Sequence, residues 1–288
     1  METKVWTVMD VRNWAVPYLT KAHVDSPRKT IEMMMCSVLH TDKLGLYMQF
    51  ERILSSAELA TLRDMIDRRV RKREPLQYII GSTFFHGLEI CVDPRVLIPR
   101  PETEQLVEHA VRILREQRLT RDSLRVADIG TGSGCIALAI ASIMPDVHVT
   151  AIDVSRDALD VASMNAARLN ICNLQFDHRD ALDSLPWSDE FDLIVSNPPY
   201  IPKSEMASLD AEVRAFEPER ALTDYDDGLL FYRHYALVFP TILKPSGSFL
   251  LELGYGMAEE TSRVFREWNT KIHKDLDGRD RIIEGYRT

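Results

Sequence analysis

The chain has 288 residues, of which 45% are hydrophobic and 27% charged, a composition that excludes a disordered protein and predicts one large domain with a small one. Its 44 Asp and Glu outnumber its 35 Lys and Arg, so the net charge is -9 and general binding to nucleic acid or anionic membrane is not expected. The four cysteines lie far apart and the apolar runs are short, so we expect a cytoplasmic protein without disulfides, a metal site or a membrane span.

Residues 1–75 are predicted to form a small helical domain. Ser26 and Pro27 precede apolar residues at helical spacing, and Ser55 with Glu58 fits a capping box for a further helix. Residues 1–80 contain 13 Lys and Arg against 10 Asp and Glu, and residues 68–73 (RRVRKR) form a dense basic run. This run is interpreted either as a solvated helix end or as a docking surface for an acidic or RNA-rich partner.

Residues 76–93 are predicted to form a β-hairpin linker. The apolar run 76–80 is expected to be a strand before Gly81, and residues 84–85 and 89–92 flank a turn at His86-Gly87. Two prolines then hold residues 97–104 (LIPRPETE) extended, and a helix is expected after Pro101 because acidic residues follow it.

The remaining domain, residues 94–288, is predicted to be α/β, because strands and helices alternate from Leu124 onward. Such alternation is typical of a mostly parallel sheet covered by helices on both faces. The expected strands are residues 125–129, 147–152, 174–178, 191–196 and 248–253, and the expected helices are residues 135–144, 155–169 and 229–243.

A glycine-rich turn, residues 128–134 (DIGTGSG), joins the first of these strands to its helix. Glycines allow a ligand to approach the backbone, and a helix N-terminus offers N–H groups to an anion. The spacing is G-x-G-x-G, whereas a dinucleotide fold would have a third glycine where Cys135 stands. Asp153 ends the next strand 23 residues after Gly130, where a carboxylate can accept both ribose hydroxyls. The turn alone would fit a purely structural role, but together these features predict a nucleoside ligand.

The tetrapeptide Asn197-Pro198-Pro199-Tyr200 directly follows the expected strand 191–196 and suits a planar carboxamide. An amide nitrogen is a poor nucleophile, so a site that uses it must hold its N–H groups and direct its lone pair at a methyl donor. The Asn197 side-chain oxygen can accept one N–H, the Pro198 carbonyl the other, and Tyr200 can lie flat against the amide. These bonds strengthen as positive charge develops on the nitrogen. The alternative interpretation is a strand that is ended by prolines.

The glycine-rich turn resembles the S-adenosylmethionine loop of class I methyltransferases, and the tetrapeptide resembles those that act on planar nitrogen. Further stretches are similar to one family, the release-factor glutamine methyltransferases (PrmC/HemK): residues 74–79 (EPLQYI), 97–104 (LIPRPETE), 128–137 (DIGTGSGCIA), 191–201 (FDLIVSNPPYI), 217–218 (EP), 221–222 (AL) and 251–254 (LELG). The resemblance implies a Rossmann-like, mostly parallel seven-stranded sheet preceded by a helical substrate-docking domain.

The resemblance also implies an activity, the transfer of a methyl group from S-adenosylmethionine to the glutamine side chain in the GGQ motif of bacterial peptide chain release factors. Carried over by position, the cofactor would contact Gly130, Thr131, Gly132, Ser133 and Gly134 with its methionine part, Asp153 with its ribose, Asp180 and Ala181 with its adenine, and also Asn197. The glutamine would be held by Asn197, Pro198, Pro199 and Tyr200, of which Asn197, Pro198 and Tyr200 are expected to be catalytic. The chain departs from the family at Ala181-Leu182, where some relatives have an aromatic residue, and at Met257, where glutamine is usual.

Two other enzymatic activities remain as alternatives. A DNA adenine or cytosine N-methyltransferase would share the tetrapeptide, but it needs a basic face to bind the duplex, whereas residues 81–288 carry a net charge of -12. A glutamine methyltransferase could instead act on another translation protein. A module that binds S-adenosylmethionine without catalysis would leave the tetrapeptide without a purpose. We therefore expect release factors as partners and no direct binding of DNA or membrane.

Overall fold

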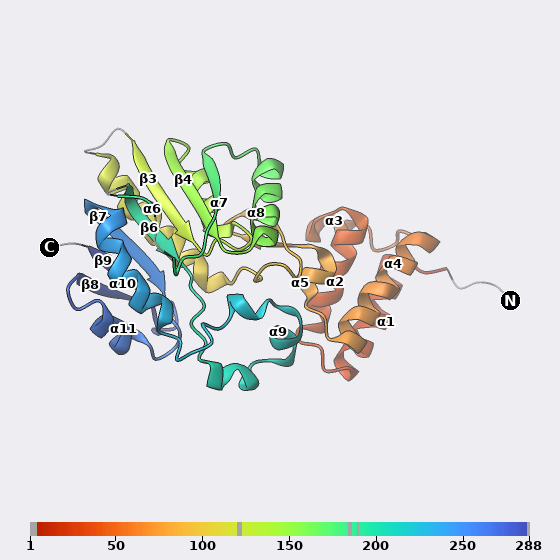
Figure 1. Ribbon diagram of the computed structural model, residues 1–288. Helices are drawn as coiled ribbons and strands as arrows, with labels where there is room; N and C mark the ends of the chain where they lie inside the picture. The colour runs from red at the N-terminus through yellow and green to blue at the C-terminus, as the bar shows by residue number, and fades with distance from the viewer. Residues whose placement is uncertain (1–4, 120–122, 184–185, 189, 287–288) are drawn as a thin grey trace. The chain divides into compact units, whose positions relative to one another are not determined.

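The computed structural model describes residues 5–119, 123–183, 186–188 and 190–286, and the chain divides into two compact units (Figure 1). The first unit comprises Met1–Gly81 together with Ala211–Phe216, and the second comprises Ser82–Asp210 and Glu217–Thr288. A segment of six residues from the second half of the sequence therefore belongs to the N-terminal unit.

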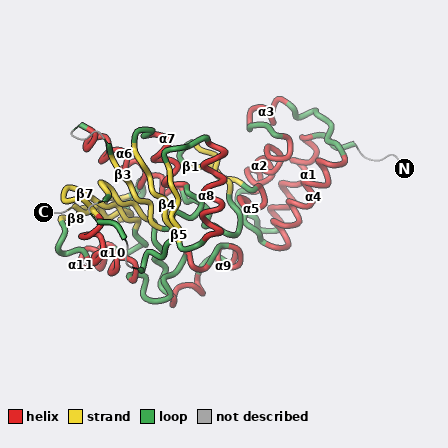
Figure 2. Tube along the Cα trace, turned by 45° about the horizontal axis from the view of Figure 1, so that its top comes forward, coloured by secondary structure: helices red, strands yellow, loops and turns green. Residues whose placement is uncertain are grey.

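The first unit is helical (Figure 2). Its elements are α1 (Val8–Lys21), α2 (Pro27–Leu39), α3 (Lys43–Met48), α4 (Ser56–Asp67), the π-helical turn η1 (Arg68–Lys72), α5 (Leu76–Ile80) and α9 (Ala211–Phe216). The predicted capping box of Ser55 and Glu58 is confirmed, whereas the Ser26 side chain does not cap α2. Ile31, Met34 and Met35 of α2 are fully buried in the core.

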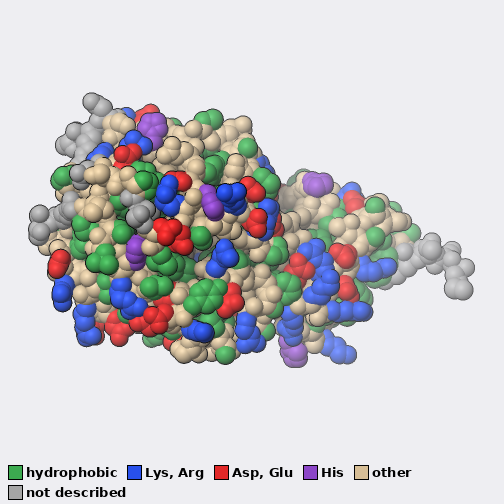
Figure 3. All heavy atoms as spheres, in the orientation of Figure 1, with side chains coloured by type: hydrophobic (Ala, Val, Ile, Leu, Met, Phe, Trp, Pro, Cys, Tyr) green, Lys and Arg blue, Asp and Glu red, His purple; other side chains and the backbone are tan. Residues whose placement is uncertain are grey.

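The basic run at residues 68–73 is largely paired within its own unit. Arg68 pairs with Glu74, Arg69 with Glu212 of α9 at 2.6 Å, and Arg71 with Asp67 at 2.8 Å. Three of its five cations therefore have carboxylate partners. Figure 3 shows that acidic side chains also accompany basic ones over the visible face of the molecule.

The expected strand at residues 76–80 is wrong, because this segment forms the helix α5. Pro75 stands at its N-cap, and Gly81, with φ +84°, ends it by donating its N–H to the Gln77 carbonyl. A five-residue apolar run cannot be assigned to strand or helix by periodicity alone. The predicted hairpin is present but begins later, with β1 (Ser82–Phe85) and β2 (Leu88–Cys91) paired around the turn at His86-Gly87.

The second unit contains a seven-stranded sheet in its described part, as predicted. Its strands are β3 (Leu124–Ile129), β4 (Val147–Asp153), β5 (Leu174–His178), β6 (Phe191–Ser196), β7 (Leu243–Glu252), β8 (Asn269–Lys274) and β9 (Asp280–Tyr286). Their order is β5-β4-β3-β6-β7-β9-β8, in which β9 is antiparallel to both neighbours. The strands β8 and β9 were not among the expected ones, and β7 begins at Leu243 rather than at Ser248.

Helices cover both faces of this sheet (Figure 1). They are α6 (Glu104–Arg118), α7 (Cys135–Ile143), α8 (Arg156–Leu169), α10 (Leu230–Ile242) and α11 (Ala258–Val264), with the short turns η2 (Pro101–Thr103), η3 (Lys203–Ser208) and η4 (Glu219–Ala221). From β3 the chain continues through α7 to β4 and through α8 to β5, toward one edge of the sheet. From β6 it continues through α10 to β7, toward the other edge. Because such crossovers are right-handed, α7 and α8 lie on one face and α10 lies on the other.

The strand order thus reverses between β3 and β6. In open α/β sheets, ligands bind beyond the carboxyl ends of the strands at the point where the strand order reverses. The glycine-rich turn follows β3, Asp153 ends β4 and Asn197 follows β6, so all three lie at this edge of the sheet.

The described residues contain neither a membrane-spanning helix nor a cluster of metal ligands. No helix in this part of the chain has the length and apolar character needed to cross a membrane. Within the same ranges, no group of three or more His, Cys, Asp and Glu side chains is arranged to hold a metal ion.

Candidate active site

The glycines of the turn after β3 are required for two different reasons. Gly130, Gly132 and Gly134 have φ values of +76°, +55° and +82°, in the left-handed region that side chains rarely adopt. A Cβ added at Gly130 or Gly132 would meet no protein atom within 4 Å, so the bare backbone faces open space there. A Cβ at Gly134 would lie 3.0 Å from the Ala162 Cβ, so this glycine permits the turn to pack against α8.

Asp128 holds the turn from beneath. Its Oδ2 accepts hydrogen bonds from the Thr131 hydroxyl at 2.7 Å and from the Ala137 N–H at 3.1 Å. Burial raises the pKa of Asp128 to about 7. Thr131 and Ser133 are also buried. These side chains shape the turn from the protein side.

Asp153, at the end of β4, also holds the turn. Its Oδ2 accepts the Gly132 N–H at 2.9 Å, and its Oδ1 accepts the Ser155 N–H at 2.8 Å. Burial raises the pKa of Asp153, while the positive charge of Arg220 acts in the opposite direction. Because a carboxylate oxygen can accept more than one hydrogen bond, both oxygens retain capacity for a ligand hydroxyl.

A cavity of about 780 Å³, measured out to the solvent at its mouth, brings most of the predicted site residues together. Of the predicted residues, its lining contains Gly130, Gly132, Asp153, Asp180, Ala181, Asn197, Pro198 and Pro199. The described residues that line it do not include Thr131, Ser133, Gly134 or Tyr200.

Other lining residues were not among the predicted ones. They are contributed by the segment after the hairpin, by the end of β5, by η4 and by α10, and include Arg95, Leu97, Arg179, Arg220, Phe231 and Tyr235. Phe231 supplies an aromatic surface to a cavity that Ala181 also lines. The spacing of Phe231, Tyr235 and Phe239 on one face of α10 was the available signal, although it also fits a helix that only packs on the sheet.

Asn197 begins a chain of hydrogen bonds that leads away from the cavity. Its Nδ2 donates to the Thr103 hydroxyl at 3.3 Å, and this hydroxyl donates to Oε2 of Glu252 at 2.7 Å. The Tyr200 hydroxyl donates to the other oxygen of Glu252 at 3.2 Å. Burial raises the pKa of Glu252 and, together with the negative charge of Glu252, that of Tyr200. The tetrapeptide is thus anchored at both its first and its last residue.

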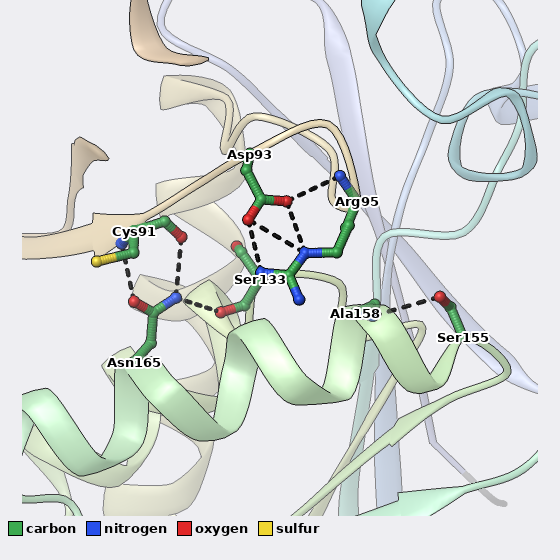
Figure 4. A network of polar contacts seen from close by, with 7 residues as sticks. All are labelled: Cys91, Asp93, Arg95, Ser133, Ser155, Ala158 and Asn165. Carbon is green, nitrogen blue, oxygen red and sulfur yellow. Dashed lines mark hydrogen bonds and ion pairs between the residues drawn. The ribbon is translucent and has the colours of Figure 1, made fainter. Parts of the chain in front are cut away.

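Asn165 of α8 ties the glycine-rich turn to the hairpin (Figure 4). Its Oδ1 accepts the Cys91 N–H at 2.8 Å, and its Nδ2 donates to the carbonyls of Cys91 and Ser133, both at 3.0 Å. Beside it, Arg95 forms an ion pair with Asp93 at 2.6 Å. The chain that leaves the hairpin is therefore fixed where it reaches the cavity.

Glu217 fixes the next part of this segment. Its side chain pairs with Arg100 at 2.6 Å and accepts the Ile98 N–H at 3.2 Å. Two stretches that the sequence analysis singled out, residues 97–104 and 217–218, are thereby joined at the rim of the cavity. Met257 packs against the apolar core of the second unit, close to Gly254.

Chemically, the cavity combines three features. The backbone at Gly130 and Gly132 leaves room for close approach of a ligand, the carboxylate of Asp153 can accept hydroxyl groups, and the side-chain oxygen of Asn197 can accept an N–H. The arrangement suits a nucleoside-containing molecule placed beside a planar amide.

Comparison with known proteins gives the same assignment. Residues 10–81 match the family described as PrmC N-terminal domain, and residues 103–217 match the Methyltransferase small domain. The release factor glutamine methyltransferase of Geobacter sulfurreducens is 40% identical over 98% of this chain and 97% of its own length. The corresponding proteins of Chlorobaculum tepidum and Bacillus subtilis are 42% and 35% identical, covering 91% and 96% of this chain and 90% and 96% of their own lengths.

A solved structure shares the fold at low identity. The hMettl16 catalytic domain, in complex with a 3′UTR hairpin, superposes with a TM-score of 0.54 and 14% identity, covering 82% of this chain and 85% of its own. The predicted fold class and the resemblance found in the sequence are both confirmed. With relatives this similar along nearly the whole of both sequences, the chain belongs to the release factor glutamine methyltransferase family.

Proposed function

We propose that this chain transfers a methyl group from S-adenosylmethionine to the side-chain amide nitrogen of the glutamine in the GGQ motif of bacterial peptide chain release factors. The observation that carries the proposal is a single cavity lined by the glycine-rich turn, by Asp153 and by Asn197, Pro198 and Pro199. Because release factors act on ribosomes, we place the reaction in the cytoplasm.

The residues around the cavity fit S-adenosylmethionine, which when bound supplies a methyl group on a positively charged sulfur. The bare backbone of Gly130 and Gly132 would take the methionine part, and Asp153 would accept the ribose hydroxyls. Asp180, Ala181 and Phe231 would surround the adenine, while Thr131, Ser133 and Gly134 would maintain the turn from behind.

Asn197 and Pro198 would orient the glutamine amide. The Asn197 Oδ1 accepts one amide N–H and the Pro198 carbonyl accepts the other, which leaves the nitrogen lone pair directed at the methyl group. A nitrogen–carbon bond forms as the sulfur–carbon bond breaks. Positive charge that develops on the nitrogen strengthens both hydrogen bonds, and the excess proton leaves after transfer, so no strong base is required.

Pro199 and Tyr200 would complete the glutamine site. Pro199 lines the cavity, whereas the Tyr200 hydroxyl is occupied by Glu252. We propose that Tyr200 both supports the tetrapeptide and contacts the flat face of the substrate amide.

The helical unit is proposed to dock the release factor. Its α1 and α4 form a groove lined by Trp6, Trp14, Tyr18 and Arg63, in which Trp14 is 49% exposed. Trp14→Ala is expected to raise KM for an intact release factor without changing KM for a short peptide that contains GGQ. Equal changes for both substrates would contradict the docking role.

The proposed function is tested with labelled S-adenosylmethionine and three acceptors, namely release factor, its GGQ→GGA variant and duplex DNA. Label on the wild-type factor alone is expected. Label on the variant would show that a residue other than the GGQ glutamine is methylated, and label on DNA would favour a DNA methyltransferase. Absence of label on all three, with S-adenosylmethionine bound, would indicate a different translation protein as substrate.

A further inference from the structure

A hydroxyl at the start of α6 is turned away from its helix. Thr103 is the last residue of the turn η2 and leads directly into α6. Here the side chain does not cap the helix, and instead contacts Glu252 at 2.7 Å and Asn197 at 3.3 Å. Thr103 and Glu252 are each only 2% exposed. The hydroxyl therefore serves a buried polar contact rather than the helix end.

Glu252 determines the direction of the hydrogen bonds around it. Its Oε2 accepts the Thr103 hydroxyl, and its Oε1 accepts the Tyr200 hydroxyl. Both of its oxygens thus accept a hydroxyl proton in the structure, and these two hydrogen bonds offset part of the cost of burying the carboxyl group. The single hydroxyl proton of Thr103 is thus committed to Glu252.

This commitment leaves one orientation for the Asn197 carboxamide. The Thr103 oxygen can only accept from Asn197, so the Asn197 NH₂ group must face it and the Oδ1 must point the other way. The two ends of a carboxamide are nearly equal in shape, so its orientation is decided by its partners. Rotated by half a turn, Asn197 would present its NH₂ to the N–H of a substrate amide, and two donors would oppose each other.

We infer that Thr103 and Glu252 are positioning residues that hold the Asn197 carboxamide with its oxygen toward the substrate amide. The inference rests on the proposed function, since it assigns these residues a task in the same reaction. Both act through Asn197 and do not touch the substrate. They come from two stretches that the sequence analysis singled out, residues 97–104 and 251–254, and stand 149 positions apart in the chain.

The first test compares two substitutions of Thr103. Thr103→Val removes the hydroxyl but keeps the branched shape, and Thr103→Ser keeps the hydroxyl. We expect Thr103→Val to lower kcat on release factor about tenfold, as for a lost positioning contact, with KM for S-adenosylmethionine within about twofold of wild type. Thr103→Ser is expected to stay within about twofold in kcat. An unchanged kcat in Thr103→Val, or an equal loss in Thr103→Ser, would overturn the inference.

Glu252→Gln tests whether both residues act through one chain. Glutamine keeps the shape of the side chain but brings a donor, so the Thr103 proton is no longer committed. We expect kcat to fall, and the double variant Thr103→Val/Glu252→Gln to be no slower than the slower single variant, because coupled residues are not additive. Losses that multiply would show that the two act independently.

A spectroscopic measurement separates this inference from the proposed function. In protein labelled with ¹⁵N-asparagine, the side-chain resonance of Asn197 is identified by its loss in Asn197→Ala. It should shift in Thr103→Val and stay in place in Thr103→Ser, whether or not release factor is methylated. An Asn197 resonance that is unaffected by Thr103→Val would refute the chain, while a wild-type enzyme without activity on release factor would refute only the proposed function.

Discussion

Asn165 is the residue whose replacement best tests how the cavity is supported. Asn165→Leu keeps the side-chain volume but removes three hydrogen bonds, two to Cys91 and one to the Ser133 carbonyl. The partly exposed bonds to Cys91 contribute about 1 kcal/mol each, and the Ser133 carbonyl, left buried without this partner, costs about 2 kcal/mol. We therefore expect the free energy of unfolding to fall by about 4 kcal/mol, which a domain of ordinary stability survives.

The measurement is urea unfolding followed by circular dichroism, with titration of S-adenosylmethionine by calorimetry alongside. Because Ser133 lies in the glycine-rich turn, Asn165→Leu should also weaken S-adenosylmethionine binding. Asn173→Leu is the matched control, since Asn173 donates to the carbonyls of Ala141, Met144 and Val147 and does not contact that turn. The control should lose stability but keep its Kd. A loss below about 1 kcal/mol in Asn165→Leu, or equal weakening of binding in both variants, would refute this account of the turn.

Three further predictions concern the cavity and the pH dependence of stability. Asn197→Ala should lower kcat about a hundredfold with Kd for S-adenosylmethionine nearly unchanged, because its bond strengthens in the transition state; steady-state rates near those of wild type would disprove the amide clamp. Asp153→Ala should weaken S-adenosylmethionine binding about tenfold or more by calorimetry, and an unchanged Kd would remove the ribose assignment. Burial and the neighbouring His273 lower the pKa of His109 to about 4, below its unfolded value near 6.5. As the pH falls, His109 therefore binds a proton in the unfolded state before it does so in the folded state. The stability that is present above pH 6.5 is thus lost as the pH falls toward 4. Thermal unfolding of His109→Phe should show a smaller loss of Tm between pH 7 and pH 5 than wild type, and equal losses would contradict this.

Local signals in the sequence predicted most of the second unit. The strands β3, β4 and β6 are short, largely apolar runs next to a polar or glycine-rich stretch, so their type and position could be predicted. The run at residues 76–80 was too short for periodicity to distinguish helix from strand, and Pro75 and Gly81 decided the outcome. The strands β8 (NTKIHK) and β9 (DRIIEGY) are rich in charged residues, and their pairing with each other and with β7 stabilises them.

Some residues of the candidate site could likewise be predicted from the sequence, and others could not. The glycine-rich turn and Asn197 follow strands directly and Asp153 ends one, so the rule that ligands bind beyond the carboxyl ends of strands was sufficient to bring them together. The contact between Thr103 and Glu252 depends on how α6 lies against the sheet, which no local pattern specifies. Phe231 could equally have been a packing residue of α10, and only the cavity identifies it as a lining residue.

The position of β9 within the sheet has a consequence for how this unit assembles and opens. In the described part of the chain β8 pairs with β9 and not with β7, so β8 cannot join the sheet before β9, although it is synthesised earlier. The two strands should therefore dock as a preformed hairpin, a step that amide hydrogen exchange would detect as common protection of both. β9 pairs with Glu252 through Ile282, and its Arg281 carbonyl accepts the Leu253 N–H. Transient release of this hairpin would loosen the end of β7 without unfolding β3, β4 or β6, so the proposed activity would be lost while the cavity beside β3 and β4 persists.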